Sequence, residues 1–374
     1  MSIPLVDLGA AYARQRVDID AAIAEVIGSA QFINGPQVAQ FEAEFARFCG
    51  ARHAIGVGSG TAAVHLALAA LGIGPGDVVA VPAHTFIATV EPITWLGATP
   101  RFVDVDPATG CLDPEALKTV IDGVRAVVPV HLYGGLADLA AIAEIADAAG
   151  VPVVEDAAQA HGAQYTGPDG TARRAGTYAR AGCFSFYPGK NLGAFGDAGA
   201  VTTDDDRLAQ TVRMLRDHGR VAKYEHLVVG YAHRLDTLQA AVLRAKLGGL
   251  DAANERRRSL AQRYSRLLAG VGDLALPAEP PGRRGVHHLY VVRTAHRDEL
   301  LAYLRGRGIG AGVHYPVPIH RQPAYAHLGV PAGALPAAEA WARECLSLPL
   351  YPELTEEQLA RVTSTVTAFF ETAG

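Results

Sequence analysis

The sequence predicts an α/β fold, in which a large domain holds a mainly parallel, seven-stranded sheet between helices and a smaller α+β domain follows it. Short apolar runs rich in β-branched residues recur between helical stretches, and this alternation is typical of such a sheet. Several of the runs are almost entirely apolar rather than alternating, as strands covered on both faces require. The 374 residues also suffice for two domains.

Each strand and helix of the large domain can be placed from these runs. The seven expected strands cover residues 53–57, 78–81, 101–105, 126–130, 151–155, 182–186 and 198–203. Helices are expected between them over 61–71, 114–121 and 137–149. Ligands of alternating α/β sheets collect at the carboxyl ends of the strands. Residues that directly follow a strand are therefore the first candidates for a site.

The pattern changes near residue 250, where we place the domain boundary. A helical stretch that reaches about residue 250 is followed by a second helix over 252–268 and by a link rich in proline and glycine over 276–282. A strand over 288–293, a helix over 298–307 and a terminal helix from about Thr355 complete the chain. Residues 1–250 are thus expected to form the large domain and residues 251–374 the small one.

The composition argues against nucleic-acid and membrane partners. The formal net charge is −5, and lysine and arginine form no extended basic face. No apolar run is long enough to span a bilayer, and the first residues do not resemble a secretory signal. We therefore expect a cytoplasmic protein.

The four cysteines are expected to be ordinary buried thiols. They lie far apart in the sequence, with no CxxC motif and no Cys-His cluster at metal-ligand spacing: Cys49, Cys111, Cys183 and Cys345. No metal site is expected.

Lys190 and Asp156 together indicate pyridoxal-phosphate (PLP) chemistry. Asp156 closes the apolar run that starts at Val151, and Lys190 follows the strand over 182–186. A lysine at a strand end can form a Schiff base with the cofactor, and a carboxylate at another strand end can hold the pyridine nitrogen protonated. Taken singly, a lysine is usually a solvated surface group and Asp156 could be a helix N-cap. The aromatic residues around Lys190 favour the cofactor interpretation.

The first strand ends in a glycine-rich turn that predicts an anion site. Residues 56–61 read Gly-Val-Gly-Ser-Gly-Thr and open a helix at once, so free backbone N–H groups face the carboxyl edge of the sheet. A dinucleotide-binding turn is the alternative, but Thr61 stands where its third glycine belongs and Asp77 precedes the next strand instead of ending it. The hydroxyl of Ser185 could donate to the same phosphate.

Five motifs resemble the DegT/DnrJ/EryC1/StrS aminotransferases, which are nucleotide-sugar aminotransferases of PLP fold type I. The motifs run in order over nearly the whole chain, and together they are highly specific. They occupy residues 59–61 (SGT), 82–86 (PAHTF), 155–162 (EDAAQAHG), 184–193 (FSFYPGKNLG) and 312–316 (GVHYP).

The resemblance implies a role for each matched residue. Lys190 would bind the cofactor covalently and Asp156 would pair with its ring nitrogen. Phe86 would cover the ring, Gln159 would contact the ring hydroxyl, and Gly60, Thr61 and Ser185 would hold the phosphate. The residues expected to contact the substrate are His131, Tyr133, His161, Tyr187, His314 and Tyr315.

The resemblance also implies a homodimer with shared active sites. In this family a G-x-N-x-R segment of the partner reaches the phosphate. Here residues 230–234 read Gly-Tyr-Ala-His-Arg, so Ala232 stands where the family has asparagine. Arg234, or His233, is expected to make the contact instead.

The implied reaction is a transamination in two halves, through pyridoxamine phosphate. An amino donor, expected to be L-glutamate, supplies the amino group, and a nucleotide-linked keto-sugar, expected to be a dTDP-keto-deoxysugar, receives it. Three alternatives stay open: a cyclitol (inosose) aminotransferase, a sugar dehydratase of the same fold, and a cofactor-bound regulator or scaffold. Dehydratases place histidine at the Schiff-base position, and Lys190 argues against that chemistry.

Overall fold

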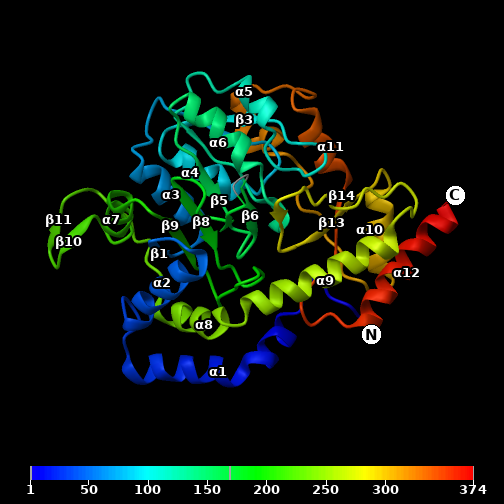
Figure 1. Cartoon of the computed structure of the whole chain (residues 1–374), viewed down its shortest axis with the longest axis horizontal. Coiled ribbons are helices and arrows are strands. Elements are labelled where there is room, and N and C mark those ends of the chain that lie inside the picture. Colours follow the sequence, from blue (N-terminus) through cyan, green and yellow to red (C-terminus); the bar gives the residue numbers. More distant parts are fainter. Residues whose placement is uncertain (1, 168–169, 374) are drawn as a thin grey trace.

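The computed structural model describes residues 2–167 and 170–373, and its centre is the expected seven-stranded sheet (Figure 1). The strands are β1 (His53–Val57), β2 (Val78–Pro82), β3 (Thr99–Val103), β4 (Ala126–Val127), β5 (Val154–Asp156), β8 (Ala181–Ser185) and β9 (Gly199–Thr203). Bridges from Val127 to Val153 and from Val130 to Asp156 join two hydrogen-bonded sheets into the order β3-β2-β4-β5-β8-β9-β1. Only β9 runs antiparallel to its neighbours. The predicted α/β class is confirmed, although β3 begins two residues before the expected strand.

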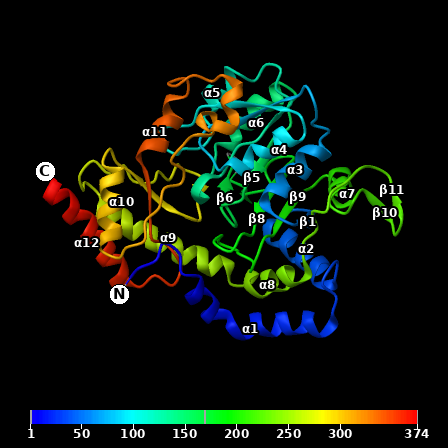
Figure 2. The same ribbon diagram turned by 180° about the vertical axis from the view of Figure 1, so that it is seen from behind.

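Helices cover both faces of the sheet (Figures 1 and 2). The helices of the first 250 residues are α1 (Leu8–Ser29), α2 (Pro36–Cys49), α3 (Gly60–Ala70), α4 (Glu91–Trp95), α5 (Pro114–Lys118), α6 (Leu139–Ala148), α7 (Asp206–Leu215) and α8 (Thr237–Leu247). Short 3-10 helices η1 (Ile87–Thr89) and η2 (Leu132–Gly134) follow β2 and β4. The expected strand-and-helix pattern began at residue 53 and left out α1 and α2.

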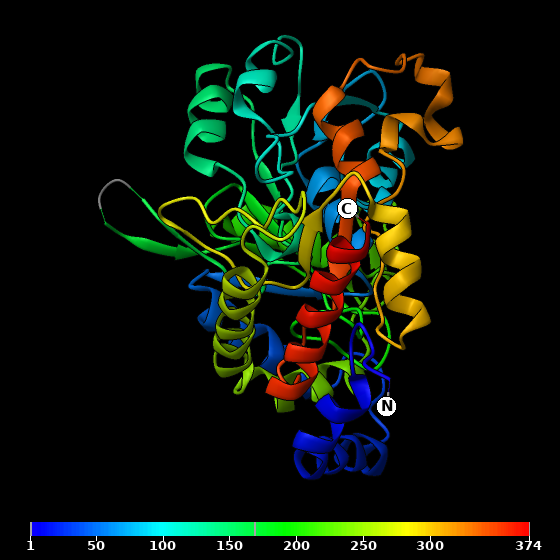
Figure 3. The same ribbon diagram turned by 90° about the vertical axis from the view of Figure 1, so that its right-hand side faces the viewer.

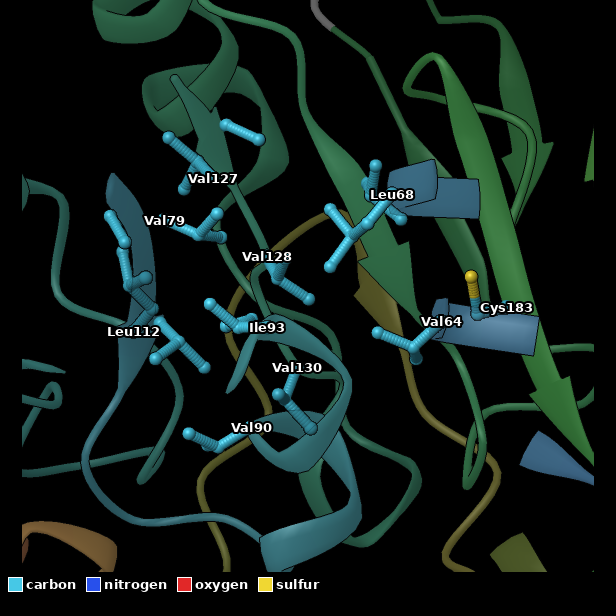
Figure 4. Close-up of a cluster of buried hydrophobic side chains, with 14 of the residues drawn as sticks. Val64, Leu68, Val79, Val90, Ile93, Leu112, Val127, Val128, Val130 and Cys183 are labelled. Atoms are coloured by element: carbon cyan, nitrogen blue, oxygen red, sulfur yellow. The ribbon is translucent and has the colours of Figure 1, made fainter. Parts of the chain in front are cut away.

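The sheet residues alternate between two hydrophobic clusters, one on each face. In β1, Ile55 and Val57 join the cluster that contains α3, whereas Ala54 joins the cluster that contains α2 and α8. Successive strand side chains point to opposite faces, so a buried central strand must be apolar throughout. Figure 4 shows part of the first cluster, in which Val64 and Leu68 of α3 lie beside Val128.

The C-terminal part builds a third cluster. The elements of this part of the chain are α9 (Leu250–Leu268), β13 (Tyr290–Arg293), α10 (Arg297–Gly306), η3 (Ile319–Arg321), η4 (Pro323–Leu328), α11 (Pro336–Glu344), β14 (Cys345–Leu348) and α12 (Glu356–Ala373). Buried apolar residues of η3, η4 and α11 join the first cluster instead. Helices α9, α10 and α12 lie around the β13–β14 pair (Figure 3). Ile3 belongs to this cluster and bridges to Ile309, so the start of the chain packs here. The domain boundary near residue 250 stays a prediction, which the separate cluster supports.

Small strands lie outside the main sheet. A three-stranded sheet combines β6 (Gln164–Thr166), β7 (Ala172–Arg174) and β12 (Arg283–Arg284), and a hairpin combines β10 (Arg220–Ala222) and β11 (Glu225–His226). The hairpin projects from the body beside α7 (Figures 1 and 2). Within the described residues, no helix has the length and apolar character that a membrane span requires.

Candidate active site

A cavity of about 480 Å³ opens at the carboxyl ends of the strands and holds most of the predicted cofactor residues. Side chains from β5, β8, the start of α3 and the loop before β13 line it. Its predicted members are Gly60, Thr61, Phe86, Asp156, Gln159, Ser185, Tyr187, Lys190, His314 and Tyr315. Residues far apart in the sequence therefore meet at one place, as the strand order requires.

Lys190 lies in a tight turn after β8. The turn is closed by a hydrogen bond from the Lys190 amide to the Tyr187 carbonyl at 2.8 Å, and the Ala194 amide donates to the Phe186 carbonyl at 2.7 Å. Burial lowers the pKa of the Lys190 amine to about 8, while the charge of Asp156 acts in the opposite direction. Lys190 can therefore release and regain a proton near neutral pH, which a proton carrier needs.

Asp156 is a buried carboxylate with two fixed partners. Its Oδ2 accepts a hydrogen bond of 2.7 Å from the Thr89 hydroxyl, and its Oδ1 accepts one of 3.1 Å from the Ala158 amide. Thr89 itself is paired with the Thr85 hydroxyl at 3.0 Å. The carboxylate is thus oriented at the floor of the cavity, where it can accept a hydrogen bond from a cationic ring. Sequence reasoning missed Thr89, which lies three residues after Phe86.

The start of α3 forms the predicted anion site. Ser59 caps the helix by accepting the Ala62 amide at 3.0 Å, and the amides of Gly60 and Thr61 belong to the first turn, which has no partners within the helix. A Cβ on Gly60 would lie 2.5 Å from the Cβ of Ser185. Only glycine allows this close approach, which brings the Ser185 hydroxyl beside the helix N-terminus. Together these donors fit a phosphate dianion.

Aromatic residues stand above the floor of the cavity. Phe86 is 51% exposed although it is a large apolar side chain. Its ring centroid lies 5.4 Å from that of Tyr315, with the two planes 33° apart. Gln159 is fixed between the Tyr133 amide, which donates to its Oε1 at 2.5 Å, and the Tyr315 hydroxyl, which accepts from its Nε2 at 3.2 Å. An exposed ring at a cavity is suited to cover a flat ligand.

Three of the predicted substrate residues do not line the cavity, and their prediction is corrected. His131 is fully buried, bonded at 3.0 Å to Glu155 and at 3.2 Å to the Ala137 amide. The hydroxyl of Tyr133 is bonded to His84 and to the carbonyl of His314. Both residues do follow a strand end, as expected. Their polar groups, however, point into the core and form hydrogen bonds there instead of facing the cavity.

His161 is the third correction. It is fully buried between the rings of Phe184 and Phe186, with centroids 5.4 and 5.5 Å away. Neither ring nitrogen has a hydrogen-bond partner among the described residues, and burial followed by the charge of Lys190 lowers its pKa to about 3. It is therefore a neutral core residue behind β8.

Arg234 does not line the cavity of its own chain. Its guanidinium donates to Asp217 at 2.8 Å, and its Nε is buried with no partner in the part of the chain that the structure describes. The segment that carries it lies against the end of β1, where the Gly58 amide donates to the His233 carbonyl at 2.9 Å. Its contact with the phosphate of a partner subunit stays a prediction. Ala232 is exposed and supplies no polar side chain.

The fold and the cavity define a PLP-dependent enzyme of the aspartate-aminotransferase fold. The residues fit the cofactor: a lysine with a lowered pKa, an oriented carboxylate, an exposed ring and a free helix N-terminus share one cavity. The chain belongs to the DegT/DnrJ/EryC1/StrS aminotransferase family, whose model matches residues 14–367. The predicted family and the predicted type of enzyme, an aminotransferase, are confirmed.

Individual relatives are similar over almost their full length. A dTDP-3-amino-3,4,6-trideoxy-α-D-glucose transaminase of Streptomyces venezuelae is 49% identical over 99% of this chain and 96% of its own. A pleiotropic regulatory protein of Geobacillus stearothermophilus is 46% identical over 99% of both chains. The crystal structure of S. venezuelae DesV in complex with a ketimine intermediate has a TM-score of 0.96 at 49% identity, over 99% of each chain.

Proposed function

We propose that the protein transfers the amino group of L-glutamate to the 3-keto group of a dTDP-linked deoxysugar. The convergence of Lys190 and Asp156 on one cavity carries the proposal, because this pair is what PLP-dependent transamination needs. The S. venezuelae relative, a dTDP-3-amino-3,4,6-trideoxy-α-D-glucose transaminase, supports the position of the amino group and the nucleotide. The sugar product would serve natural-product or surface-glycan biosynthesis.

The cofactor, when bound, carries the amino group and withdraws electrons from the reacting carbon. The side chains of the cavity would bind and orient the cofactor and transfer the proton. Asp156, which is held by hydrogen bonds from the Thr89 hydroxyl and the Ala158 amide, would pair with the pyridine nitrogen and keep it protonated. Lys190 takes a proton from the amino donor and returns it to the acceptor. Gly60, Thr61 and Ser185 would hold the phosphate, Phe86 would cover the ring, and Gln159 would contact the ring hydroxyl.

The remaining cavity residues are assigned to the substrate. Tyr187, His314 and Tyr315 also line the cavity, and Tyr187 is 59% exposed. His314 is anchored by a bond of 2.8 Å between its Nδ1 and the Ser347 hydroxyl. These polar groups would orient the sugar without carrying charge.

We also propose a homodimer that shares its active sites. Among the described residues that line the cavity, Lys190 is the only lysine or arginine, so a phosphate dianion lacks a permanent cation from its own chain. The β10–β11 hairpin and the residues after it expose apolar side chains, with Tyr224 at 85%, Leu227 at 64% and Val229 at 93%. A partner would cover this surface and bring Arg234 to the phosphate.

The four free, buried cysteines support a cytoplasmic location.

The pyridoxamine form of the protein tests the substrate. It is mixed with a panel of dTDP-keto-sugars, UDP-keto-sugars and inososes, and the return of the aldehyde absorbance is followed. We expect a dTDP-3-keto-deoxysugar to react fastest. A preference for inososes would establish the cyclitol alternative, and no reaction with any ketone, in protein that glutamate converts normally, would contradict the proposed acceptor class.

A further inference from the structure

His288 lines the cavity but has no role in the chemistry described so far. It lies two residues before β13 and is 8% exposed. Its Nδ1 lies 3.3 Å from the Oδ1 of Asn191, the residue directly after Lys190. The imidazole is thus tied to the turn that carries the lysine.

A chain of amides decides which ring nitrogen carries the hydrogen. Asn254 of α9 donates from Nδ2 to the His161 carbonyl at 2.7 Å, so its Oδ1 is an acceptor. That oxygen accepts from the Nδ2 of Asn191 at 2.9 Å, and the same Nδ2 donates to the Val286 carbonyl at 3.1 Å. The Oδ1 of Asn191 is therefore the acceptor toward His288, and the Nδ1 of His288 must donate.

The charge state of His288 follows from its surroundings. Burial is the main cause that holds its pKa well below 6.5, and the cations Lys190 and Arg257, followed by His161 and His314, act in the same direction. The ring is neutral, and its one hydrogen is on Nδ1. Nε2 keeps a lone pair, has no protein partner among the described residues, and is not sealed from solvent.

We propose that His288 is a positioning residue for Lys190: in the pyridoxamine form of the enzyme, Nε2 accepts a hydrogen bond from the Lys190 Nζ. The inference rests on the proposed function, in which Lys190 alternates between bound and free states. Both side chains line one cavity, and the Asn191 link holds the ring beside the backbone of Lys190. An unpaired Nε2 on a ring that lines the same cavity would keep the free lysine in place during proton transfer.

The low basicity of His288 suits this role. A neutral imidazole whose protonation is disfavoured accepts a hydrogen bond without removing the proton from the lysine. The pKa of Lys190 is about 8 because burial lowers it and Asp156 partly offsets the effect. His161 and His314 also lie near Lys190, and burial lowers the pKa of both, so both are neutral. Asp197, Tyr187 and Tyr315 line the same cavity. Loss of the Nε2 acceptor should lower the lysine pKa further.

The tautomer can be observed directly, without turnover. Long-range ¹H–¹⁵N correlation spectra of the full-length holoenzyme in its pyridoxamine form, assigned with His288→Gln, should show a protonated Nδ1 and an unprotonated Nε2 at neutral pH. The signals should not titrate between pH 8 and pH 6. A protonated Nε2, or an imidazolium at neutral pH, would overturn the inference even if the enzyme turns over as proposed.

A matched pair of variants tests the link to Lys190. His288→Asn keeps a donor near the position of Nδ1 but has no acceptor at Nε2, whereas His288→Gln can place an amide oxygen near Nε2. Single-turnover amination of the ketone should rise with pH as Lys190 loses its proton. We expect this limb to move about one pH unit lower in His288→Asn, the scale of one hydrogen bond to a charged group, and to stay near the wild-type position in His288→Gln.

If His288 had a purely structural role, both variants would be slower, but the pH at which the single-turnover rate rises would not change. Equal shifts in both variants, or no shift in His288→Asn with its thermal unfolding unchanged, would overturn the inference. If the wild-type enzyme aminates no ketone, the proposed acceptor fails, while the glutamate half-reaction still reports the Lys190 limb and keeps the His288 test separate.

Discussion

At the residue scale, Asp156 is the carboxylate whose loss should separate chemistry from cofactor binding. Asp156→Asn keeps the size of the side chain and removes the charge that holds the pyridine nitrogen protonated. We expect kcat to fall at least a hundredfold, or about 2.7 kcal/mol in barrier height, with a much smaller change in the Kd of the cofactor. Stopped-flow kinetics and absorbance titration measure the two quantities.

Thr89→Val provides the control for Asp156. It removes the 2.7 Å hydrogen bond to the carboxylate but leaves the charge. Its loss of kcat should be clearly smaller than that of Asp156→Asn. Near-normal turnover in Asp156→Asn would mean that the residue only caps the turn at Ala158.

Because His161 is buried as a neutral side chain, the stability of the fold should depend on pH. Its pKa in the folded chain is about 3, below the ordinary 6.5. The contribution of neutral His161 to stability is therefore fully present above pH 6.5 and is lost as the pH falls toward 3. In that range the unfolded chain binds a proton at His161 and the folded chain does not. When the pH is lowered from 7.5 to 5.5, protonation of His161 in the unfolded chain should decrease the free energy of unfolding by about 1.4 kcal/mol.

His161→Leu should abolish the part of this pH-dependent decrease in the free energy of unfolding that is due to His161. Urea unfolding of both proteins at the two pH values gives the difference, and the other buried histidines cancel in the comparison. An equal loss of stability in the variant and the wild type would show that His161 takes up a proton in the folded state.

At the scale of elements, the junction between α3 and β8 controls phosphate binding. In Gly60→Ala the new Cβ would lie 2.5 Å from the Cβ of Ser185, so the turn or the strand end must move. We expect the Kd of the cofactor to rise at least tenfold, about 1.4 kcal/mol, with little change in thermal unfolding. Gly74→Ala is the control, because no described atom beyond its two chain neighbours would lie within 4 Å of the new Cβ. Unchanged cofactor binding in Gly60→Ala would exclude this turn from the phosphate site.

The elements differ in how well the sequence predicts them. Strands such as β1 and β2 stand out because they are buried on both faces and so almost entirely apolar. The β10–β11 hairpin is exposed and carries no such pattern, and sequence reasoning missed it. The antiparallel direction of β9 depends on pairing with β1 and β8, which no local pattern contains.

The same contrast holds for the site. Lys190, Asp156 and the helix N-terminus at Gly60 follow from strand-end positions, because the carboxyl ends of parallel strands share one edge. His131 also follows a strand end, but its orientation toward Glu155 depends on a contact within the core. The amide chain from Asn254 through Asn191 to His288 joins three elements far apart in sequence, and a single sequence does not predict such a chain.

At the scale of the whole molecule, the dimer can be tested by mixing inactive subunits. Lys190→Ala subunits and Arg234→Ala subunits should each be inactive or weak alone. In a heterodimer with shared sites, one site carries both defects and the other carries none. After free exchange we expect roughly a quarter of wild-type activity, because half of the dimers are mixed and each has one intact site. No recovery despite proven exchange would mean that Arg234 acts within its own chain or not at all.

The central claim is that Lys190 is the residue that binds PLP covalently and carries the proton. Borohydride reduction of the PLP-loaded protein, followed by peptide mass spectrometry, tests it most directly. The account predicts one modified peptide, with the cofactor on Lys190 in the wild type, and none in Lys190→Ala, whose far-ultraviolet circular dichroism should match the wild type. Attachment to any other lysine in the wild type, or no attachment at all, would contradict the account.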